Sequence, residues 1–249
     1  MKCEQVFFVG AMDVDWQKKL TNRALLEMFS NITMYHGAQV GHTALEGVSP
    51  VSWMVMNYKM KVYCRPSMFS HVRVETWISG YSKVRADREY IVRDAQGELI
   101  CRASAIWVAL DGATGNPLRM TEKLMEGFGT DEEKNFPDLN YLNPRKFSVN
   151  AMQTQTIQLH RSMDDYNGHV HNSMYLEIAQ EALPADLYRG TFGEIEIAYK
   201  NEITSGSEVL LEYAEGNGEC RIAIRSPEDG RLHGAVVLDG FRSATISQR

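Results

Sequence analysis

The chain has 249 residues, with 26 lysines and arginines, 32 aspartates and glutamates, and a formal net charge of −6. Hydrophobic residues make up 44% of it, which excludes a largely disordered chain, and the acidic balance argues against nucleic-acid binding. No stretch of about 18 apolar residues occurs, so we expect no membrane span. The isolated cysteines Cys3, Cys64, Cys101 and Cys220 predict neither a zinc cage nor a disulfide framework, and favour a cytoplasmic protein.

The first half predicts one helix followed by strands. Apolar residues recur at steps of three and four from about Leu20 to about Gly37, which indicates a helix with one buried stripe. The runs that follow are rich in Val, Ile, Trp, Tyr and Met and are separated by Pro, Gly and a tight Asp-Ala-Gln-Gly turn. These runs predict strands over residues 52–63, 72–80, 85–93 and 99–110.

The second half restarts the pattern after a polar stretch. Residues 121–145 carry Pro137 and Pro144, lack periodicity and predict a linker between an N-terminal domain, 1–120, and a C-terminal domain, 146–249. The later elements that we predict are a strand over 149–159, a helix over 172–183 closed by Pro184, and strands over 194–199, 208–213, 218–224 and 231–242.

The restart is an internal repeat. Residues 15–22 align with 165–172 at an offset of 150, and residues 70–75 align with 207–212 at an offset of 137. The offset decreases from 150 to 137 because the second half has a shorter loop between helix and strands, where length changes are tolerated. The repeat predicts an α+β protein with a tandem, or double, hot-dog fold, in which each half wraps an antiparallel sheet around a long helix.

The two halves differ where chemistry concentrates. Asp165, Asn167 and His169 alternate just before the second helix, whereas the first half has Asp15, Gln17 and Lys19 at those positions. Under the 137 offset, Glu202 takes the place of Arg65. We therefore expect one active site per chain, in the second half.

Residues 165–175, Asp-Tyr-Asn-Gly-His-Val-His-Asn-Ser-Met-Tyr, resemble the D-x-N-x-H-V-N-N-x-x-Y motif of acyl-acyl carrier protein thioesterases. Residues 199–203, Tyr-Lys-Asn-Glu-Ile, resemble the later Y-R-R-E-C motif of that family, and several first-half strands resemble its N-terminal domain. The resemblance implies a thioester hydrolase that ends fatty acid synthesis. The positions that match its catalytic residues are Asp165, Asn167, His169 and Glu202.

Two departures from the family motif limit what the resemblance implies. The family cysteine is Ile203 here, which cannot act as a nucleophile, and the second motif asparagine is His171, to which we assign no role. No transit peptide precedes the domain, so the chain is expected to be a bacterial member.

Thioester hydrolysis needs an activated water and a place for the developing oxyanion. We expect Glu202 to act as general base, made more basic by a nearby apolar tunnel. His169 and Asn167 would hold the water or polarise the carbonyl, Asp165 would orient them, and backbone N–H groups at the helix N-terminus would stabilise the oxyanion. An acyl-enzyme on Asp165 is an open alternative. No metal or redox cofactor is required.

The substrate would be a fatty acyl chain on the phosphopantetheine arm of acyl carrier protein. The family places chain-length selection in the N-terminal half, where Met28, Trp53, Met54 and Met56 are candidates to line an acyl tunnel. Because acyl carrier protein is acidic, docking needs a basic patch. The candidates are Lys83, Arg85 and Arg88, or else Lys18, Lys19 and Arg23.

Other functions remain open from sequence alone. An acyl-coenzyme A thioesterase of the same fold would also have to bind the adenine nucleotide. A hot-dog dehydratase uses a histidine and a carboxylate in a different order, and a non-catalytic acyl-binding module would have no need of the four polar residues. A chain with two hot dogs is compatible with a monomer or a homodimer.

Overall fold

The computed structural model describes residues 2–42, 51–204 and 206–242. It divides into two compact units. The first comprises Met1–Tyr58 and Val62–Leu139, and the second comprises Lys59–Lys61 and Asn140–Arg249. Among the described helices, none is both long enough and apolar enough to cross a membrane.

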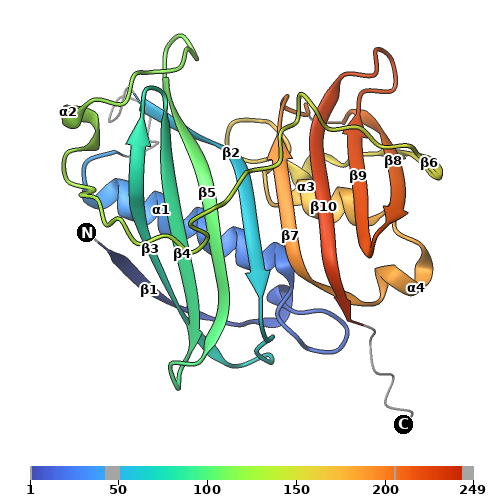
Figure 1. The fold of residues 1–249 in the computed structure, drawn as a ribbon, viewed down its shortest axis with the longest axis horizontal. Helices are drawn as coiled ribbons and strands as arrows, with labels where there is room; N and C mark the ends of the chain where they lie inside the picture. Colours follow the sequence, from blue (N-terminus) through green and yellow to red (C-terminus); the bar gives the residue numbers. More distant parts are fainter. Residues whose placement is uncertain (1, 43–50, 205, 243–249) are drawn as a thin grey trace. The chain divides into compact units, whose positions relative to one another are not determined.

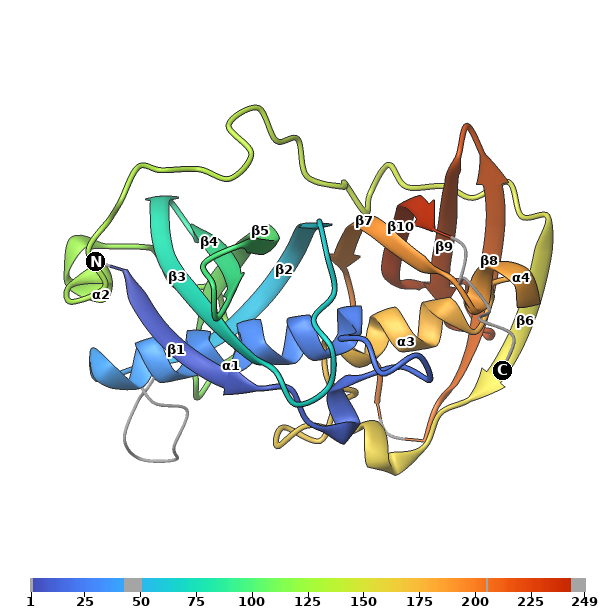
Figure 2. The same cartoon turned by 90° about the horizontal axis from the view of Figure 1, so that it is seen from below.

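The first unit is an antiparallel sheet with one long helix against it. Its strands are β1 (Cys3–Phe8), β2 (Val51–Val62), β3 (His71–Ser82), β4 (Arg85–Asp94) and β5 (Leu99–Asp111), in the spatial order β1-β3-β4-β5-β2. The 3-10 turn η1 (Ala11–Asp13) precedes helix α1 (Asn22–Gln39), and the short helix α2 (Glu122–Met125) follows the strands. Figures 1 and 2 show α1 packed against one side of these strands.

The sequence explains where α1 begins and which side it buries. The helix begins at Asn22 rather than Leu20, because the Thr21 hydroxyl accepts a hydrogen bond from the backbone N–H of Ala24 as an N-cap. Its buried apolar side chains recur at helical spacing: Ala24, Leu25, Met28, Phe29 and Ile32. The Phe29 ring stacks on Tyr90 of β4 with centroids 4.5 Å apart, which anchors the helix to the sheet.

The second unit repeats this arrangement with a shorter helix. Its strands are β6 (Gln153–Gln158), β7 (Thr191–Tyr199), β8 (Glu208–Gly216), β9 (Glu219–Arg225) and β10 (Leu232–Arg242), in the order β7-β10-β9-β8-β6 with antiparallel pairing. The helical segments are η2 (Arg161–Met163), α3 (Met174–Gln180) and α4 (Ala185–Tyr188). Helix α3 contacts β9 and β10.

The predicted fold class, an α+β tandem hot-dog fold, is confirmed, and two element predictions need correction. The helix expected over 172–183 is α3 alone, and Pro184 stands at the N-cap of α4, where its fixed φ opens a new turn. Strand β1 was not predicted. It is six residues long and, among the described strands, pairs only with β3. Val6 and Phe8 are exposed on it, so its pattern does not stand out as a strand.

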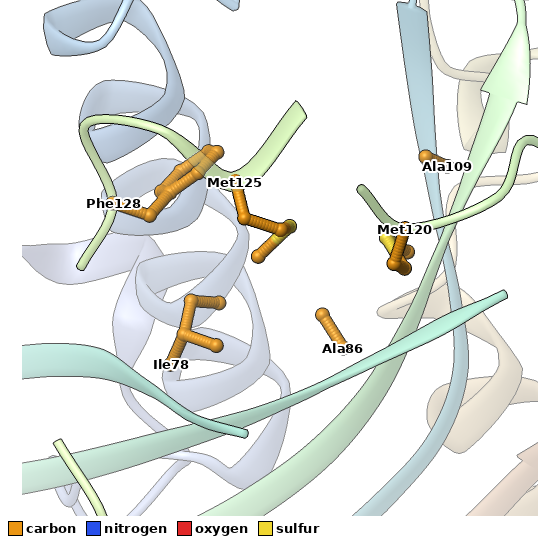
Figure 3. Packing of buried hydrophobic residues seen from close by; sticks show 6 residues of the cluster. All are labelled: Ile78, Ala86, Ala109, Met120, Met125 and Phe128. Atoms are coloured by element: carbon orange, nitrogen blue, oxygen red, sulfur yellow. The ribbon is translucent and has the colours of Figure 1, made fainter. Parts of the chain in front are cut away.

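The polar stretch that resembles a linker also contributes to the first core. Met125 and Phe128 pack with Ile78, Ala86, Ala109 and Met120, as Figure 3 shows. Further along, the Asn135 side-chain amide donates to the backbone carbonyls of Tyr90 and Ala103. Residues up to Leu139 therefore belong to the first unit, and the stretch is more than a connector.

Candidate active site

The Asp165 carboxylate organises the loop that precedes α3. Its Oδ1 accepts hydrogen bonds from the backbone N–H groups of Asn167 at 2.8 Å and His169 at 3.4 Å. A backbone hydrogen bond from Asp165 N–H to His169 C=O, 2.7 Å long, closes the loop. Gly168 takes the positive φ of 77° that the turn requires. Asp165 thus shapes the loop on which Asn167 and His169 stand.

The same carboxylate also orients one side chain. The amide Nδ2 of Asn167 donates to Asp165 Oδ2 at 3.2 Å, which holds the amide beside the loop. The contact from Asp165 to His169 goes to the backbone, not to the imidazole. Asp165 therefore orients the side chain of Asn167, as predicted. For His169 it fixes the backbone and does not contact the imidazole.

His169 and Glu202 form a carboxylate–imidazole pair. His169 Nε2 lies 3.4 Å from Glu202 Oε2, and the side chains are 36% and 62% exposed. Two backbone links bring them together: Val170 N–H donates to Ile203 C=O at 3.0 Å, and His169 is bridged to Thr204 in antiparallel fashion. The predicted desolvation of Glu202 by an apolar tunnel is wrong for this structure, since most of its side chain is open to solvent.

Buried groups hold the backbone of Glu202 from behind. His233 on β10 is 6% exposed and its Nδ1 lies 2.9 Å from the carbonyl oxygen of Glu202. Because a carbonyl only accepts, Nδ1 carries the proton, and burial lowers the pKa of His233, so the ring is neutral. The Tyr175 hydroxyl donates to the Asn201 carbonyl at 3.2 Å, and burial raises the pKa of Tyr175, which keeps that donor protonated.

The start of α3 does not supply the predicted oxyanion donors. The N–H groups of Met174 and Tyr175 donate to the carbonyls of His171 and Asn172, and the Ser173 N–H donates to His171 Nδ1 at 3.2 Å. His171 Nδ1 also accepts from the Ser173 hydroxyl at 2.9 Å. The backbone N–H groups of His169, Val170 and His171, which the prediction included, also donate within the chain and are therefore not free as predicted, and His171 acts as a local cap of the helix.

Ile203 stands where a cysteine nucleophile would be, and its side chain is fully buried. Cys220, the cysteine of the second unit, is buried on β9 with its sulfur 3.8 Å from the Tyr213 hydroxyl. Burial raises the pKa of the Cys220 thiol and keeps it protonated. The second unit therefore provides no thiolate for nucleophilic catalysis.

The first unit carries the same loop without the same chemistry. Asp15 Oδ1 accepts from the N–H groups of Gln17 at 2.8 Å and Lys19 at 3.0 Å, and η1 and η2 are exactly 150 positions apart. The bridge between Lys19 and Ser67 matches the bridge between His169 and Thr204 under both predicted offsets, so the repeat is confirmed.

The predicted tunnel residues lie in the first unit. Met28 on α1 is 4% exposed, and on β2 Trp53 packs against the core around Phe128 while Met54 and Met56 are half-buried. Lining of an acyl tunnel by these side chains stays a prediction.

The predicted docking patch is corrected at one residue. Lys83 is exposed at a turn with φ 44°, and Arg85 is exposed and paired with Asp87 at 3.2 Å. Arg88 is 3% exposed, so it cannot contact a carrier protein. Three positions apart on one strand, Arg85 and Arg88 face opposite sides of the sheet. In the alternative cluster, Lys19 bonds Ser67 and Arg23 pairs with Glu27 at 2.7 Å.

The supporting residues His233, Tyr175 and Asn201 were not predicted as part of the site. Two signals in the sequence point to them in retrospect. His233 interrupts the apolar strand Leu-His-Gly-Ala-Val-Val, and Gly234 follows it. A Cβ at Gly234 would lie 2.8 Å from Tyr175 Cδ1, so the glycine lets the tyrosine ring approach the strand.

Comparisons with known proteins match both halves of the chain to one family. Residues 1–128 match the acyl-ACP thioesterase N-terminal domain and residues 148–236 match the acyl-ACP thioesterase C-terminal domain. An oleoyl-acyl carrier protein thioesterase of Arabidopsis thaliana is 22% identical over 205 residues, or 74% of this chain and 54% of the plant protein. A palmitoyl-acyl carrier protein thioesterase of the same plant is 25% identical over 209 residues, or 76% and 48%. The chain thus spans about half the length of these curated relatives.

Solved structures show the same fold. An acyl-ACP thioesterase from Bacteroides thetaiotaomicron is 21% identical with a TM-score of 0.83, covering 97% of this chain and 98% of that one. A 12:0-ACP thioesterase from Umbellularia californica is 18% identical with a TM-score of 0.79, covering 98% of both chains. With both family domains matched in order along the sequence, the chain belongs to the acyl-ACP thioesterase family.

Proposed function

We propose that the protein hydrolyses the thioester of a fatty acyl-acyl carrier protein and releases the free fatty acid. The observation that carries this proposal is the His169–Glu202 pair, whose Nε2 and Oε2 atoms lie 3.4 Å apart. His169 shares its loop with the hydrogen-bonded Asp165 and Asn167. Carboxylate, imidazole and carboxamide together provide the proton acceptor and donors that acyl transfer to water needs. The named activities of the plant relatives support the same substrate class.

In the proposed reaction Glu202 accepts a proton from a water molecule as its oxygen attacks the thioester carbonyl. The carbonyl π electrons move to oxygen, and N–H groups of Asn167 or His169 donate to the resulting oxyanion. When the tetrahedral intermediate collapses, the carbon–sulfur bond breaks and the proton returns from Glu202 to the leaving thiolate. Glu202 is then a carboxylate again, and the products are a fatty acid and the carrier thiol.

Each unit has its own task in this proposal. The second unit performs the chemistry, and the first holds the acyl chain. The exposure of Glu202 at 62% gives water ready access to the carboxylate. A bound acyl thioester would then cover this carboxylate and exclude water from around it.

The test is fatty acid release from acyl-acyl carrier proteins of medium to long chain length, beside the matching coenzyme A esters. We expect turnover that favours the carrier protein. Glu202→Gln and His169→Ala should each lower kcat by about 100-fold or more. Preference for coenzyme A esters would contradict the substrate, and wild-type rates in both variants would contradict the site.

Matched controls come from the same unit. Glu228, exposed in the turn before β10, and His160, exposed before η2, have no side-chain hydrogen bond among the described residues. Glu228→Gln and His160→Ala should leave kcat unchanged. A loss in the controls equal to that in the site variants would show that the effect is not specific to the His169–Glu202 pair.

A further inference from the structure

Arg88 is a cation in the interior of the first unit, and among the described residues it has no acidic partner. Arg88 is 3% exposed, and its Nη1 donates to His36 Nδ1 and to Thr76 Oγ1, both at 3.2 Å. Within the described part of the chain, no carboxylate forms an ion pair with Arg88, and its buried Nε has no hydrogen-bond partner. Nε and Nη2 form the edge of a guanidinium that binds a carboxylate through two parallel hydrogen bonds.

His36 offers a further donor beside this edge. Because Arg88 can only donate, His36 Nδ1 must accept, so the proton of the neutral ring is on Nε2. Burial, and then the Arg88 charge, lower the pKa of His36 to about 4, which keeps the ring neutral at physiological pH. His36 Nε2 is buried and, among the residues described, also lacks a partner.

These donors gather around the ring of Phe128. The centroids of His36 and Trp53 lie 5.1 and 5.9 Å from that of Phe128, and Arg88 Cζ lies 5.6 Å from it. The indole N–H of Trp53 is buried and, like the other two, has no partner in the described ranges. Three unsatisfied N–H donors on side chains packed around one ring are unusual, because buried polar groups are normally hydrogen-bonded.

The surroundings define the chemistry of the occupant. A group that satisfies three N–H donors must bring lone pairs, and a buried guanidinium favours a negative charge there. The core cluster that contains Phe128 is otherwise apolar and includes Ile78, Met120 and Met125, shown in Figure 3. Methionine side chains adapt readily to a new neighbour. A monoanion on an apolar body fits these surroundings better than a strongly hydrated phosphate.

We propose that the first unit binds the carboxylate of an aliphatic acid in its interior around Phe128. The Nε–Nη2 edge of Arg88 takes the two carboxylate oxygens, and the N–H groups of His36 and Trp53 complete their coordination. Two sources share this chemistry: a free fatty acid, and an acyl thioester whose far end carries a carboxylate. Naming these sources rests on the proposed function, whereas the carboxylate site itself does not.

The test is calorimetric titration of the full chain with dodecanoate and with its methyl ester, which has the same chain without the charge. We expect the acid to bind and the ester to bind about tenfold more weakly or not at all. Arg88→Met should weaken dodecanoate binding by about tenfold or more, whereas Arg85→Met, on the same strand and exposed, should leave it unchanged. Equal binding of acid and ester, unchanged binding by Arg88→Met, or no binding of the acid would overturn the proposal.

A second variant keeps the test valid if Arg88→Met does not fold. Trp53→Phe keeps an aromatic ring but removes the indole N–H. It should weaken the binding of dodecanoate several-fold without affecting the binding of the methyl ester. An equal loss of affinity for both ligands would mean that Trp53 contributes packing alone and does not bind the carboxylate.

The source is identified by turnover. Faster hydrolysis of an ω-carboxyacyl thioester than of the unsubstituted one, lost in Arg88→Met, would identify the substrate as the source. Inhibition by dodecanoate that Arg88→Met relieves would identify the free acid. The titration needs no turnover, so a failed proposed function and a failed carboxylate site give different results.

Discussion

His36 should make the stability of the protein depend on pH in a measurable window. The imidazole is 1% exposed, and its pKa falls from 6.5 to about 4 because burial, and secondly the Arg88 charge, oppose protonation. Of the described side chains, Arg88 is the charged one hydrogen-bonded to it, and its aromatic neighbour is Phe128. Protonation would destroy the Nδ1 acceptor and place two cations 3.2 Å apart.

The sign follows from which state binds more protons. Between about pH 6.5 and pH 4 the unfolded chain protonates His36 and the folded chain does not. The stabilising contribution is therefore complete above pH 6.5 and decreases as the pH falls toward 4. The difference between the two pKa values corresponds to a loss on the order of 3 kcal/mol at pH 4.

The assay is urea denaturation at a series of pH values for the wild type and His36→Gln. Glutamine can still accept from Arg88 through its carbonyl oxygen but does not titrate, and the other acidic groups are common to both proteins. Between pH 6.5 and pH 4, the wild type should lose on the order of 3 kcal/mol more free energy of unfolding than the variant. His160→Gln, at an exposed position, should behave as the wild type. Parallel pH profiles of the wild type and His36→Gln would refute the reasoning.

Three further changes test the packing behind the two sites. His233→Phe removes the donor to the Glu202 carbonyl and should lower kcat about tenfold while leaving KM nearly unchanged; a change in KM alone would contradict a positioning role. Gly234→Ala places a Cβ 2.8 Å from Tyr175 Cδ1 and should cost about 1–3 kcal/mol in thermal unfolding, so an unchanged Tm would contradict the close approach. Phe128→Ala should cost about 3–5 kcal/mol in urea denaturation, and a cost below about 1 kcal/mol would mean that its ring does not support the core.

The fold could be predicted because its main signals are local and repeated. The apolar stripe of α1 lies on one helix face, and the strands are bounded by Gly, Pro and Asp turns. The loop at Asp165 is determined by one carboxylate and its own neighbours, and for this reason the copy at Asp15 has the same hydrogen bonds. The catalytic candidates Asp165, Asn167 and His169 come together because they share that loop.

The failures concern facts that depend on pairing between distant segments. Arg88 looks like a neighbour of Lys83 and Arg85 in the sequence, but which side of β4 is buried depends on the elements packed against the sheet. The backbone N–H groups at the start of α3 donate to carbonyl groups and to His171 Nδ1, and these hydrogen bonds are known only once the loop conformation is known. His233 approaches Glu202 through pairing of β10, 31 positions away along the chain. Composition and spacing do not reveal which partners these groups contact.

The duplicated loop allows the chemistry to be separated from the scaffold. In the first unit Arg65 occupies the position equivalent to Glu202, and its guanidinium donates to Leu20 C=O at 2.8 Å and Asn22 Oδ1 at 2.6 Å. The residues equivalent to Leu20 and Asn22 are Val170 and Asn172, which offer the same acceptors. Lys19, the equivalent of His169, donates to Ser67 Oγ at 2.9 Å, and a hydroxyl is also present at Thr204.

The double variant His169→Lys with Glu202→Arg should therefore convert the second loop into the first without disturbing the fold. Because each new side chain has its acceptors in place, we expect Tm to stay within about 4 °C of the wild type. Thioester hydrolysis should fall by about 100-fold or more, since neither new group accepts a proton from water at neutral pH. A folded variant that retains hydrolysis would separate the reaction from the His169–Glu202 pair. An unfolded variant would show that the two loops are not equivalent scaffolds, despite their matching hydrogen bonds.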